Sequence, residues 1–102
     1  MSRRRSIRWT RLADLDLQAA HSYLEARNSN AARRFAAEIL KALEHIQAHP
    51  EAGAVASDLF PRGRYRHWVC GHHRIIYRIA EDWIWLLRIW DSRRNPADLI
   101  PE

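Results

Sequence analysis

The sequence predicts an α+β fold in which a helical hairpin packs on one face of a mainly antiparallel sheet. Two consecutive segments in the first half space their apolar residues three and four apart, as amphipathic helices do. After a stretch that contains proline and glycine, the apolar period changes to two, which is typical of strands. The 102 residues suit one hydrophobic core. We therefore expect the order β-α-α-β-β-β in a single domain over residues 1–102.

The first half is predicted to hold one strand and two helices. Residues 6–9 alternate polar and apolar side chains, and Thr10 or a neighbour can begin a helix. Residues 28–30 suit a three-residue turn and a new N-cap. The second helix is expected over about 31–48, ending at His49-Pro50 because the residue before proline avoids the helical region. The expected buried stripe of the first helix is Leu12, Leu15, Ala19 and Tyr23, widened by Leu17, Ala20 and Leu24, and that of the second helix is Phe35, Ile39, Ala42, Leu43 and Ile46.

The second half is predicted to be an antiparallel meander. Residues 50–63 have proline and glycine at both ends and are expected to form a loop. The three strands are expected at 64–70, 74–80 and 84–91, with turns at Gly71 and at 80–83. Residues 92–102 form a polar tail broken by two prolines, and residues 1–5 form a basic arm.

Side-chain alternation predicts which face of the sheet carries arginines. In the strand 74–80, Ile75, Tyr77 and Ile79 point to one side, and we expect the helices to cover that side. Arg74 and Arg78 then share the opposite, solvent-facing side. In the strand 84–91 the residues on both faces are apolar enough to be buried, so the face that meets the helices stays open. One face holds Ile84, Leu86, Arg88 and Trp90, and the other holds Trp83, Trp85, Leu87 and Ile89.

The charge of the chain indicates an anionic partner. The formal net charge is +5, Lys41 is the only lysine, and eight arginines lie between residues 62 and 94. Guanidinium groups bind carboxylates and phosphates at two points, and five tryptophans cannot all be inside so small a domain. We therefore favour a binding surface over a merely solvated face. The candidate target-binding residues are Arg66, Arg74, Arg78, Arg88, Arg93, Arg94 and Trp90.

Other functional classes find less support. Cys70 is the only cysteine, so we expect no intrachain disulfide and a half-buried strand position. His67, His72 and His73 have no cysteine or carboxylate partner at ligand spacing, so neither a metal site nor a cofactor is expected. Asp14, Asp16 and Glu25 are assigned to a helix surface. No apolar run is long enough for a membrane span and the basic start lacks a signal sequence, so we expect a cytoplasmic protein.

Three long segments resemble the RelE/ParE superfamily of type II toxin–antitoxin toxins. They read WTRLADLDLQAAHSYL, NAARRFAAEILKALEHIQAHPEAG and YRHWVCGHHRIIYRIAEDWIWLLRIWDSRRNP, and they cover Trp9 to about Pro96. The most specific elements are RIIYRI, residues 74–79, followed by an acidic turn and a hydrophobic strand, and the helix-ending HPEAG. The fold that this resemblance implies is the β-α-α-β-β-β arrangement already predicted.

The resemblance implies one of two activities. RelE-like members cleave mRNA on the ribosome with basic residues and often a tyrosine, whereas ParE-like members poison DNA gyrase. The tyrosine position falls near Leu99 or Ile100, Tyr65 and His67 stand where RelE-like toxins often carry lysines, and Arg74 is shared by both groups. The chain therefore looks closer to ParE, a binder without catalysis. In the alternative, an mRNA endonuclease, Arg74, Arg78, Arg93 and Arg94 would bind phosphates and His67 or His73 would move the proton.

Either toxin implies a cognate antitoxin with an acidic, amphipathic C-terminal segment. We expect that segment to fold on binding across the helical hairpin, with Leu12, Leu24, Phe35 and Trp68 as contacts, in an assembly such as a heterotetramer. The effector target would be DNA gyrase, or alternatively the ribosome and mRNA, and no membrane is involved. A third interpretation is a basic module that binds nucleic acid by charge alone.

Overall fold

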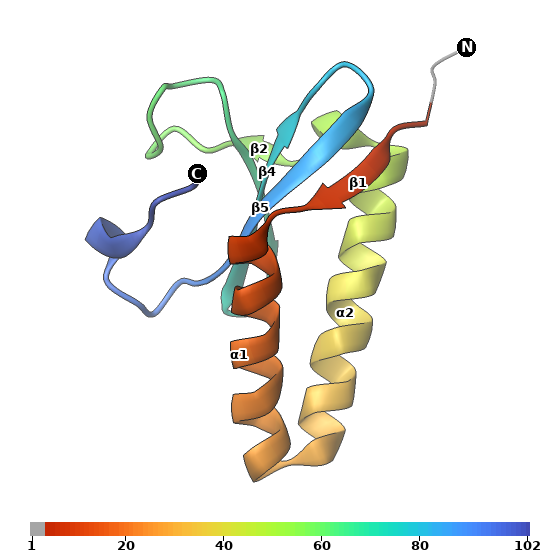
Figure 1. Cartoon of the computed structure of the whole chain (residues 1–102), viewed down its shortest axis with the longest axis vertical. Helices are drawn as coiled ribbons and strands as arrows, with labels where there is room; N and C mark the ends of the chain where they lie inside the picture. Colours follow the sequence, from red (N-terminus) through yellow and green to blue (C-terminus); the bar gives the residue numbers. More distant parts are fainter. Residues whose placement is uncertain (1–3) are drawn as a thin grey trace.

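The computed structural model describes residues 4–102, in which two helices lie against one face of a five-stranded sheet (Figure 1). This confirms the predicted α+β class. No helix among these residues is both long and apolar enough to cross a membrane. The elements are β1 (Ser6–Trp9), α1 (Arg11–Arg27), α2 (Ser29–Ala48), η1 (Pro50–Ala52), β2 (Ala54–Val55), β3 (Arg66–Cys70), β4 (His73–Ile79), β5 (Trp83–Asp91) and η2 (Pro96–Asp98).

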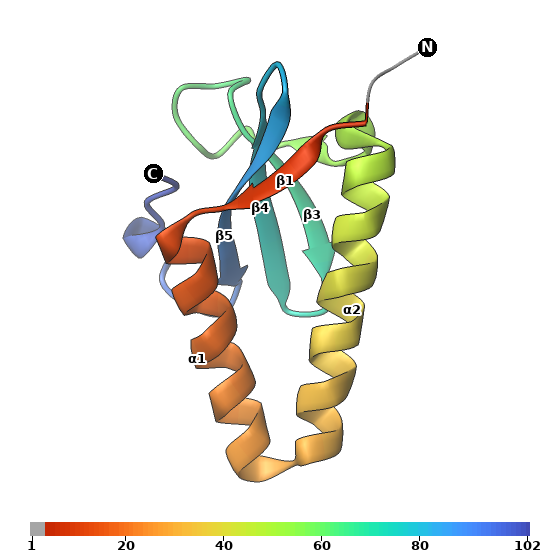
Figure 2. The ribbon, with the colours of Figure 1, turned by 45° about the vertical axis from the view of Figure 1, so that its right-hand side comes forward.

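The sheet has the strand order β1-β5-β4-β3-β2, in which β1 runs parallel to β5 and the other pairs are antiparallel. The helical hairpin is the connection after β1, and Figure 2 shows β1 crossing in front of β5 before the chain enters α1. The strand β2 was not predicted, because two residues inside a loop carry no periodic signal. It pairs with β3 through Ala54 and Val55 and closes the other edge of the sheet.

Thr10 joins the start of α1 to the middle of β5. Its side-chain oxygen accepts a hydrogen bond from Ala13 N (3.2 Å) and its hydroxyl donates to the carbonyl oxygens of Leu86 and Leu87 (3.1 and 3.0 Å). A threonine at this position satisfies one of the first helical N–H groups, as predicted. The same residue therefore fixes where the helix begins and where it leaves the sheet.

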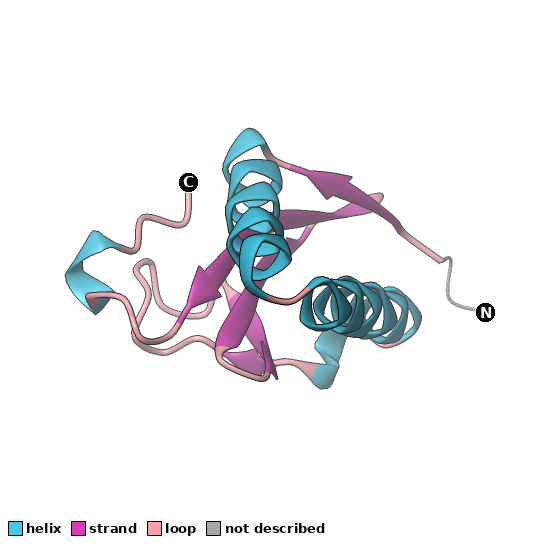
Figure 3. Cartoon of the chain, turned by 90° about the horizontal axis from the view of Figure 1, so that it is seen from below, coloured by secondary structure: helices cyan, strands magenta, loops and turns pink. Residues whose placement is uncertain are grey.

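A single residue, Asn28, separates the two helices, so the predicted three-residue turn is wrong. Asn28 is extended (φ −163°), its N–H donates to Leu24 O, and its side-chain oxygen accepts from the N–H groups of Asn30 and Ala31. Because one asparagine ends α1 and begins α2, no further linker is needed. Figure 3 looks along the two helices and shows them side by side next to the sheet.

The helix-facing core, which we call the inner core, joins the predicted stripe of α2 to one side of the sheet. Ile75, Tyr77 and Ile79 of β4 point into it, as alternation predicted. The Tyr77 hydroxyl donates to Pro50 O (2.6 Å) and accepts from Gly53 N (3.0 Å). The two motifs HPEAG and RIIYRI therefore contact each other directly in the fold.

A β-bulge in β5 resolves the orientation that the sequence left open. Ile76 pairs with Arg88 and Tyr77 pairs with Leu86, so Leu87 is the extra residue on β5. As a result Ile84 and Leu86 face the inner core while Leu87 lies on the opposite side. After the bulge, Ile89 faces the helices again and Trp90 does not. Neither alternation set proposed from the sequence is correct along the whole strand.

The face of the sheet that points away from the helices, here the outer face, is not left to solvent. A second core fills it with residues from the sheet, the loop after β2 and the tail: Ala56, Leu59, Tyr65, Ile76, Leu87, Trp90 and Leu99. In Figure 1 the tail (dark blue) returns along the side of β5 that faces away from α2. The expectation of an uncovered basic face is therefore wrong, since a loop and a tail without periodic patterning supply the cover.

Candidate functional site

The arginines of the outer face are held in networks within the chain. Both terminal nitrogens of Arg74 donate hydrogen bonds to the Asp58 carboxylate (2.9 Å each), and its Nε donates one to His67 Nδ1 (2.8 Å). The hydrogen bonds from Arg74 hold the pKa of Asp58 below its ordinary value. Burial and the neighbouring guanidinium lower the pKa of His67, and the neutral imidazole is the form that accepts this bond. Two-point pairing with Asp58 uses the same nitrogens that would grip a phosphate.

Arg78 is partnered by the tail. Its terminal nitrogen donates to one oxygen of Glu102 (3.1 Å), and Tyr65 Oη (2.7 Å) and Arg64 Nε (3.2 Å) donate to the other. Burial opposes ionisation of this carboxylate, but the three hydrogen bonds outweigh that effect and lower the pKa of Glu102. The Nε of Arg78 is buried and has no hydrogen-bond partner among the described residues.

Arg88 is a structural residue that ties α1 to β5. Its Nε and one terminal nitrogen contact the two Asp16 oxygens (2.7 and 2.9 Å), and its other terminal nitrogen donates to Ile100 O (2.9 Å). The side chains of Arg88 and Asp16 are only 9% and 11% exposed. The assignments of Arg88 to a target contact and of Asp16 to a helix surface are therefore both wrong, because each residue serves the other inside the fold.

The remaining candidates differ in how much surface they offer. Trp90 is 2% exposed and belongs to the outer-face core, so it cannot itself contact a target in this conformation. Arg66 donates to the carbonyl oxygens of Gly53 and Glu51 at the β2 end. Arg74 and Arg78 keep 15% and 24% of their side-chain surface exposed, on the predicted side of the sheet but paired. Only Arg93 and Arg94 among the predicted arginines are exposed, and the Arg93 side chain keeps 63% of its surface.

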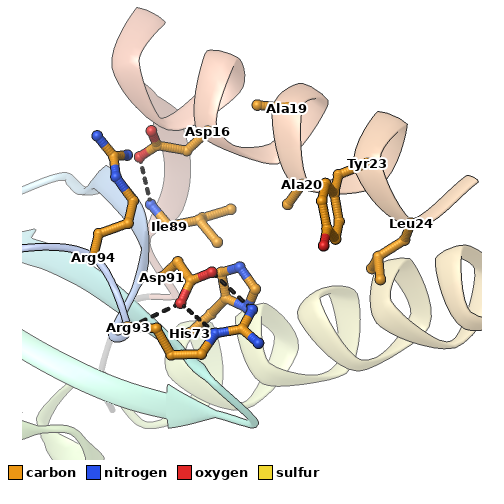
Figure 4. Close-up of a pocket in the computed structure, with 10 residues that line it drawn as sticks. All are labelled: Asp16, Ala19, Ala20, Tyr23, Leu24, His73, Ile89, Asp91, Arg93 and Arg94. Atoms are coloured by element: carbon orange, nitrogen blue, oxygen red, sulfur yellow. Dashed lines mark hydrogen bonds and ion pairs between the residues drawn. The ribbon is translucent and has the colours of Figure 1, made fainter. Parts of the chain in front are cut away.

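Arg93 and Arg94 form the rim of a pocket of about 400 Å³ between α1 and the adjoining ends of β4 and β5 (Figure 4). Arg93 is paired with Asp91 (2.8 Å), whose pKa is lowered well below its ordinary value by the Arg93 hydrogen bonds. The Arg94 guanidinium lies 4.2 Å above the Trp90 ring. The other lining residues are Asp16, Ala19, Ala20, Tyr23, Leu24, His73, Ile89 and Asp91.

The pocket combines apolar walls with basic edges. Figure 4 shows Tyr23 and Leu24 at one end of α1 and the Asp91–Arg93 pair across from them. Burial lowers the pKa of His73, which also contacts the Phe35 ring (4.9 Å between ring centres). The lining also holds two carboxylates, Asp16 and Asp91, and Asp91 is paired with Arg93. Arg94 is the cation of the rim that has no carboxylate partner among the described residues.

The predicted antitoxin contacts are spread over different surroundings. Leu24 lines the pocket, and Leu12 is exposed on α1. Trp68 lines a shallow hollow against α2 together with Lys41 and His45, whose ring lies 4.7 Å from the Trp68 ring. Phe35 is 9% exposed and part of the inner core, so its assignment to a contact surface is wrong. Helical periodicity gave the same signal for core and contact residues.

The described residues hold no cluster of three or more metal-ligating side chains. Cys70 is free and half-buried in β3, and burial raises its pKa. Of the two histidines considered for proton transfer, His67 is bound to Arg74, and His73 faces the inner core and the pocket. Asp58 and Glu102, the carboxylates that pair with Arg74 and Arg78, were not predicted, and Asp16, the partner of Arg88, was predicted only as part of a helix surface. Their only signal is a negative charge in a loop, a helix or a tail.

Comparison with known proteins gives the class to which this fold and surface belong. The family model described as "ParE toxin of type II toxin-antitoxin system, parDE" matches residues 7–96. A solved structure described as the chromosomal ParDE toxin–antitoxin system from P. aeruginosa matches with a TM-score of 0.72 and 23% sequence identity. That match covers 86% of this chain and 96% of the other. A search of curated proteins gave no match.

The fold and the family match define a toxin of the type II toxin–antitoxin class. The chain belongs to the ParE toxin family. The family match confirms the resemblance to the RelE/ParE superfamily on its ParE side, and the solved structure shows the same fold.

Proposed function

We propose that this chain is the toxin of a parDE-type pair, that it inhibits DNA gyrase, and that a cognate antitoxin neutralises it in the cytoplasm. The family match over residues 7–96 carries the proposal. The geometry supports binding rather than RNA cleavage, because both terminal nitrogens of Arg74 are bound to the Asp58 carboxylate and its Nε donates to His67. A phosphate would first have to displace both partners.

The exposed candidates for the target contact are Arg93 and Arg94 at the pocket rim, and Arg93 is bound at two points by Asp91 within the chain. Arg94 is stacked on Trp90, which holds its guanidinium without a carboxylate partner among the described residues. Arg74 presents little free surface, and Arg78 and Arg66 lie toward the other end of β4, where they are partnered as well.

The gyrase proposal is tested with the purified chain in a supercoiling assay. We expect loss of supercoiling and accumulation of cleaved DNA complexes as the chain is added in excess over gyrase. Supercoiling should return when the cognate antitoxin is added. Intact supercoiling at toxin excess would contradict the proposal, and codon-phased cuts in translated mRNA would favour the endonuclease alternative.

The antitoxin is proposed to place an apolar side chain of its acidic segment in the pocket beside α1. Its carboxylates would then meet Arg93 and Arg94, so that neutralisation would cover the residues proposed to contact gyrase. Light scattering of the purified complex would report whether the pair assembles as a heterotetramer.

An Ala19→Trp variant tests the pocket directly, since Ala19 is an exposed residue of its wall. The indole should fill the space and weaken antitoxin binding at least tenfold, about 1.4 kcal/mol. Ala37→Trp on the exposed side of α2 is the matched control and should bind the antitoxin like the unmodified chain. Equal affinities for both variants, measured by titration calorimetry, would place the antitoxin elsewhere.

A further inference from the structure

Residues 99–102 lie on the outer face with few attachments. Leu99 is buried in the outer-face core, the Ile100 carbonyl accepts from Arg88, and Glu102 accepts from Arg64, Tyr65 and Arg78. The backbone hydrogen bonds of the last part of the tail are local, from Asp98 N to Asn95 O and from Leu99 N to Pro96 O. One apolar side chain, one carbonyl and one carboxylate therefore hold the segment against the sheet.

The surface beneath these residues has the composition of a peptide-binding site. Two arginines and a tyrosine converge on the Glu102 carboxylate, and the Leu99 side chain, three positions earlier, is buried in the outer-face core. Arginine and aromatic residues are enriched where interfaces bind most strongly. The chain's own Leu99 and Glu102 show which chemistry fits: an apolar residue followed three positions later by a carboxylate.

The tail uses this site incompletely. Glu102 reaches only one terminal nitrogen of Arg78, and the buried Arg78 Nε has no acceptor. A carboxylate bound at two points would satisfy both nitrogens, as Asp58 does for Arg74 at its two terminal nitrogens and as Asp16 does for Arg88 at Nε and a terminal nitrogen. The site therefore has an unused donor that a better-placed acidic ligand could engage.

We propose that the surface under residues 99–102 binds an acidic peptide segment of a protein partner, and that Leu99 and Glu102 cover it in the free chain as a displaceable strap. The ligand carries an apolar residue three positions before a carboxylate. Charge complementarity with Arg64 and Arg78 selects the acid, and the outer-face core accepts the apolar side chain. This inference rests on the tail contacts and goes beyond the proposed action on gyrase.

The probe is a fluorescently labelled synthetic peptide with the chain's own sequence over 95–102, NPADLIPE, titrated in trans against full chains. In the unmodified chain the tethered strap competes at an effective concentration on the order of millimolar and should exclude the peptide. Glu102→Gln removes the carboxylate from the strap, and fluorescence anisotropy should then show at least tenfold tighter peptide binding. Asp98→Asn makes the same change of charge at an exposed position of the tail and should behave like the unmodified chain.

A second peptide and a second measurement separate the outcomes. NPADLIPQ should bind the Glu102→Gln chain at least tenfold more weakly than NPADLIPE, and equal binding would overturn recognition of the carboxylate. No binding of NPADLIPE by the Glu102→Gln chain at about 1 mM would overturn the site itself. Stronger binding of an oligothymidine than of the peptide would overturn it in favour of a phosphate site.

Amide relaxation measured by NMR tests the strap without any ligand. The amides of Leu99, Ile100 and residue 102 should become more mobile in Glu102→Gln and stay ordered in Asp98→Asn. Unchanged order in both variants would overturn the displaceable strap. Neither experiment contains gyrase, so their failure and a failure of the supercoiling assay are independent.

Discussion

Asp14 and Asp16 stand two positions apart on α1 and differ in what surrounds them. Asp14 is exposed and accepts one hydrogen bond from Gln18 (2.8 Å). Asp16 accepts two from Arg88 and one from Ile89 N (3.0 Å) in a site almost closed to water. A buried pair is not in itself strongly stabilising, but removal of one partner leaves an uncompensated charge.

We therefore expect Asp16→Asn to lower the free energy of unfolding by about 3–5 kcal/mol, because the Arg88 guanidinium stays buried without its carboxylate. Asp14→Asn, the same chemical change on the same helix, should alter it by less than about 0.5 kcal/mol. Urea denaturation followed by tryptophan fluorescence measures both. Similar small effects of the two variants would show that the Asp16–Arg88 pair does not hold α1 to β5.

His67 makes stability depend on pH. Burial and Arg74 lower its pKa in the folded chain, whereas in the unfolded chain it returns to its ordinary value of 6.5. Below that value the unfolded chain binds a proton that the folded chain resists, so the free energy of unfolding falls as the pH is lowered through 6.5. Above it this contribution is constant.

His67→Gln should make the pH dependence of stability shallower between about pH 5 and pH 7, since the amide oxygen can still accept from Arg74 but does not titrate. His73, whose pKa is also lowered by burial, should retain part of the slope. Urea midpoints measured across this range report the change. An unchanged slope in the variant would mean that His67 protonates equally well in the folded chain.

At the scale of elements, Gly53 and Tyr77 explain why η1 and β4 must meet. A Cβ on Gly53 would collide with the Tyr77 hydroxyl and would lie 2.8 Å from His67 O, closer than real Cβ contacts allow. The glycine is needed for close approach, because its hydrogen-bonded N–H is what the hydroxyl contacts. The loop after α2 is thereby fixed to the centre of the sheet.

Gly53→Ala should lower the free energy of unfolding by about 1–3 kcal/mol through overpacking. Tyr77→Phe should cost about 1–2 kcal/mol, because Pro50 O and Gly53 N lose their partner. The double variant should cost less than the sum, since removal of the hydroxyl relieves the collision; a double-mutant cycle by chemical denaturation measures this coupling. Strict additivity would contradict a direct contact.

The elements that the sequence predicted are those with a period of their own. The stripe of α2 and the alternation of β4 place Ile39 and Ile75 correctly, because both patterns depend only on local geometry. The bulge at Leu87 was hidden, since both faces of β5 are apolar and a shift of one residue leaves no polar side chain out of place. The strand β2 forms only because it pairs with β3, and two residues are too few to show the alternation that would predict a strand.

At the scale of the whole molecule, the sheet lies between two cores of different origin. The inner core is made by helices, while the outer core is made by a loop and a tail that reach back over the sheet. Arg74 and Asp58 are 16 positions apart, and Arg78 and Glu102 are 24 apart. Alternation in β4 predicted these arginines and their side of the sheet, but an irregular loop and tail carry no pattern that predicts their carboxylate partners.

This architecture decides which arginines can be replaced to test function without disturbing the fold. Charge reversal at Arg74 or Arg78 would set a carboxylate against Asp58 or Glu102 and would disturb the covering loop and tail. Such variants would lose activity by loosening the fold. Arg93 and Arg94 are exposed at the pocket rim, and exposed ion pairs contribute about 0–1 kcal/mol. Their replacement therefore tests a contact and leaves the two cores intact.

We expect the double variant Arg93→Gln/Arg94→Gln to need at least tenfold more protein for half-inhibition of gyrase supercoiling, about 1.4 kcal/mol of binding. The matched control is Arg33→Gln/Arg34→Gln, which makes the same change of charge at two adjacent exposed positions of α2. It should inhibit like the unmodified chain, and both variants should keep its urea midpoint. Equal loss in the two double variants would mean that net charge alone drives binding. Full inhibition by both would remove the pocket rim from the gyrase contact, which would then have to involve surface that the loop and tail now cover.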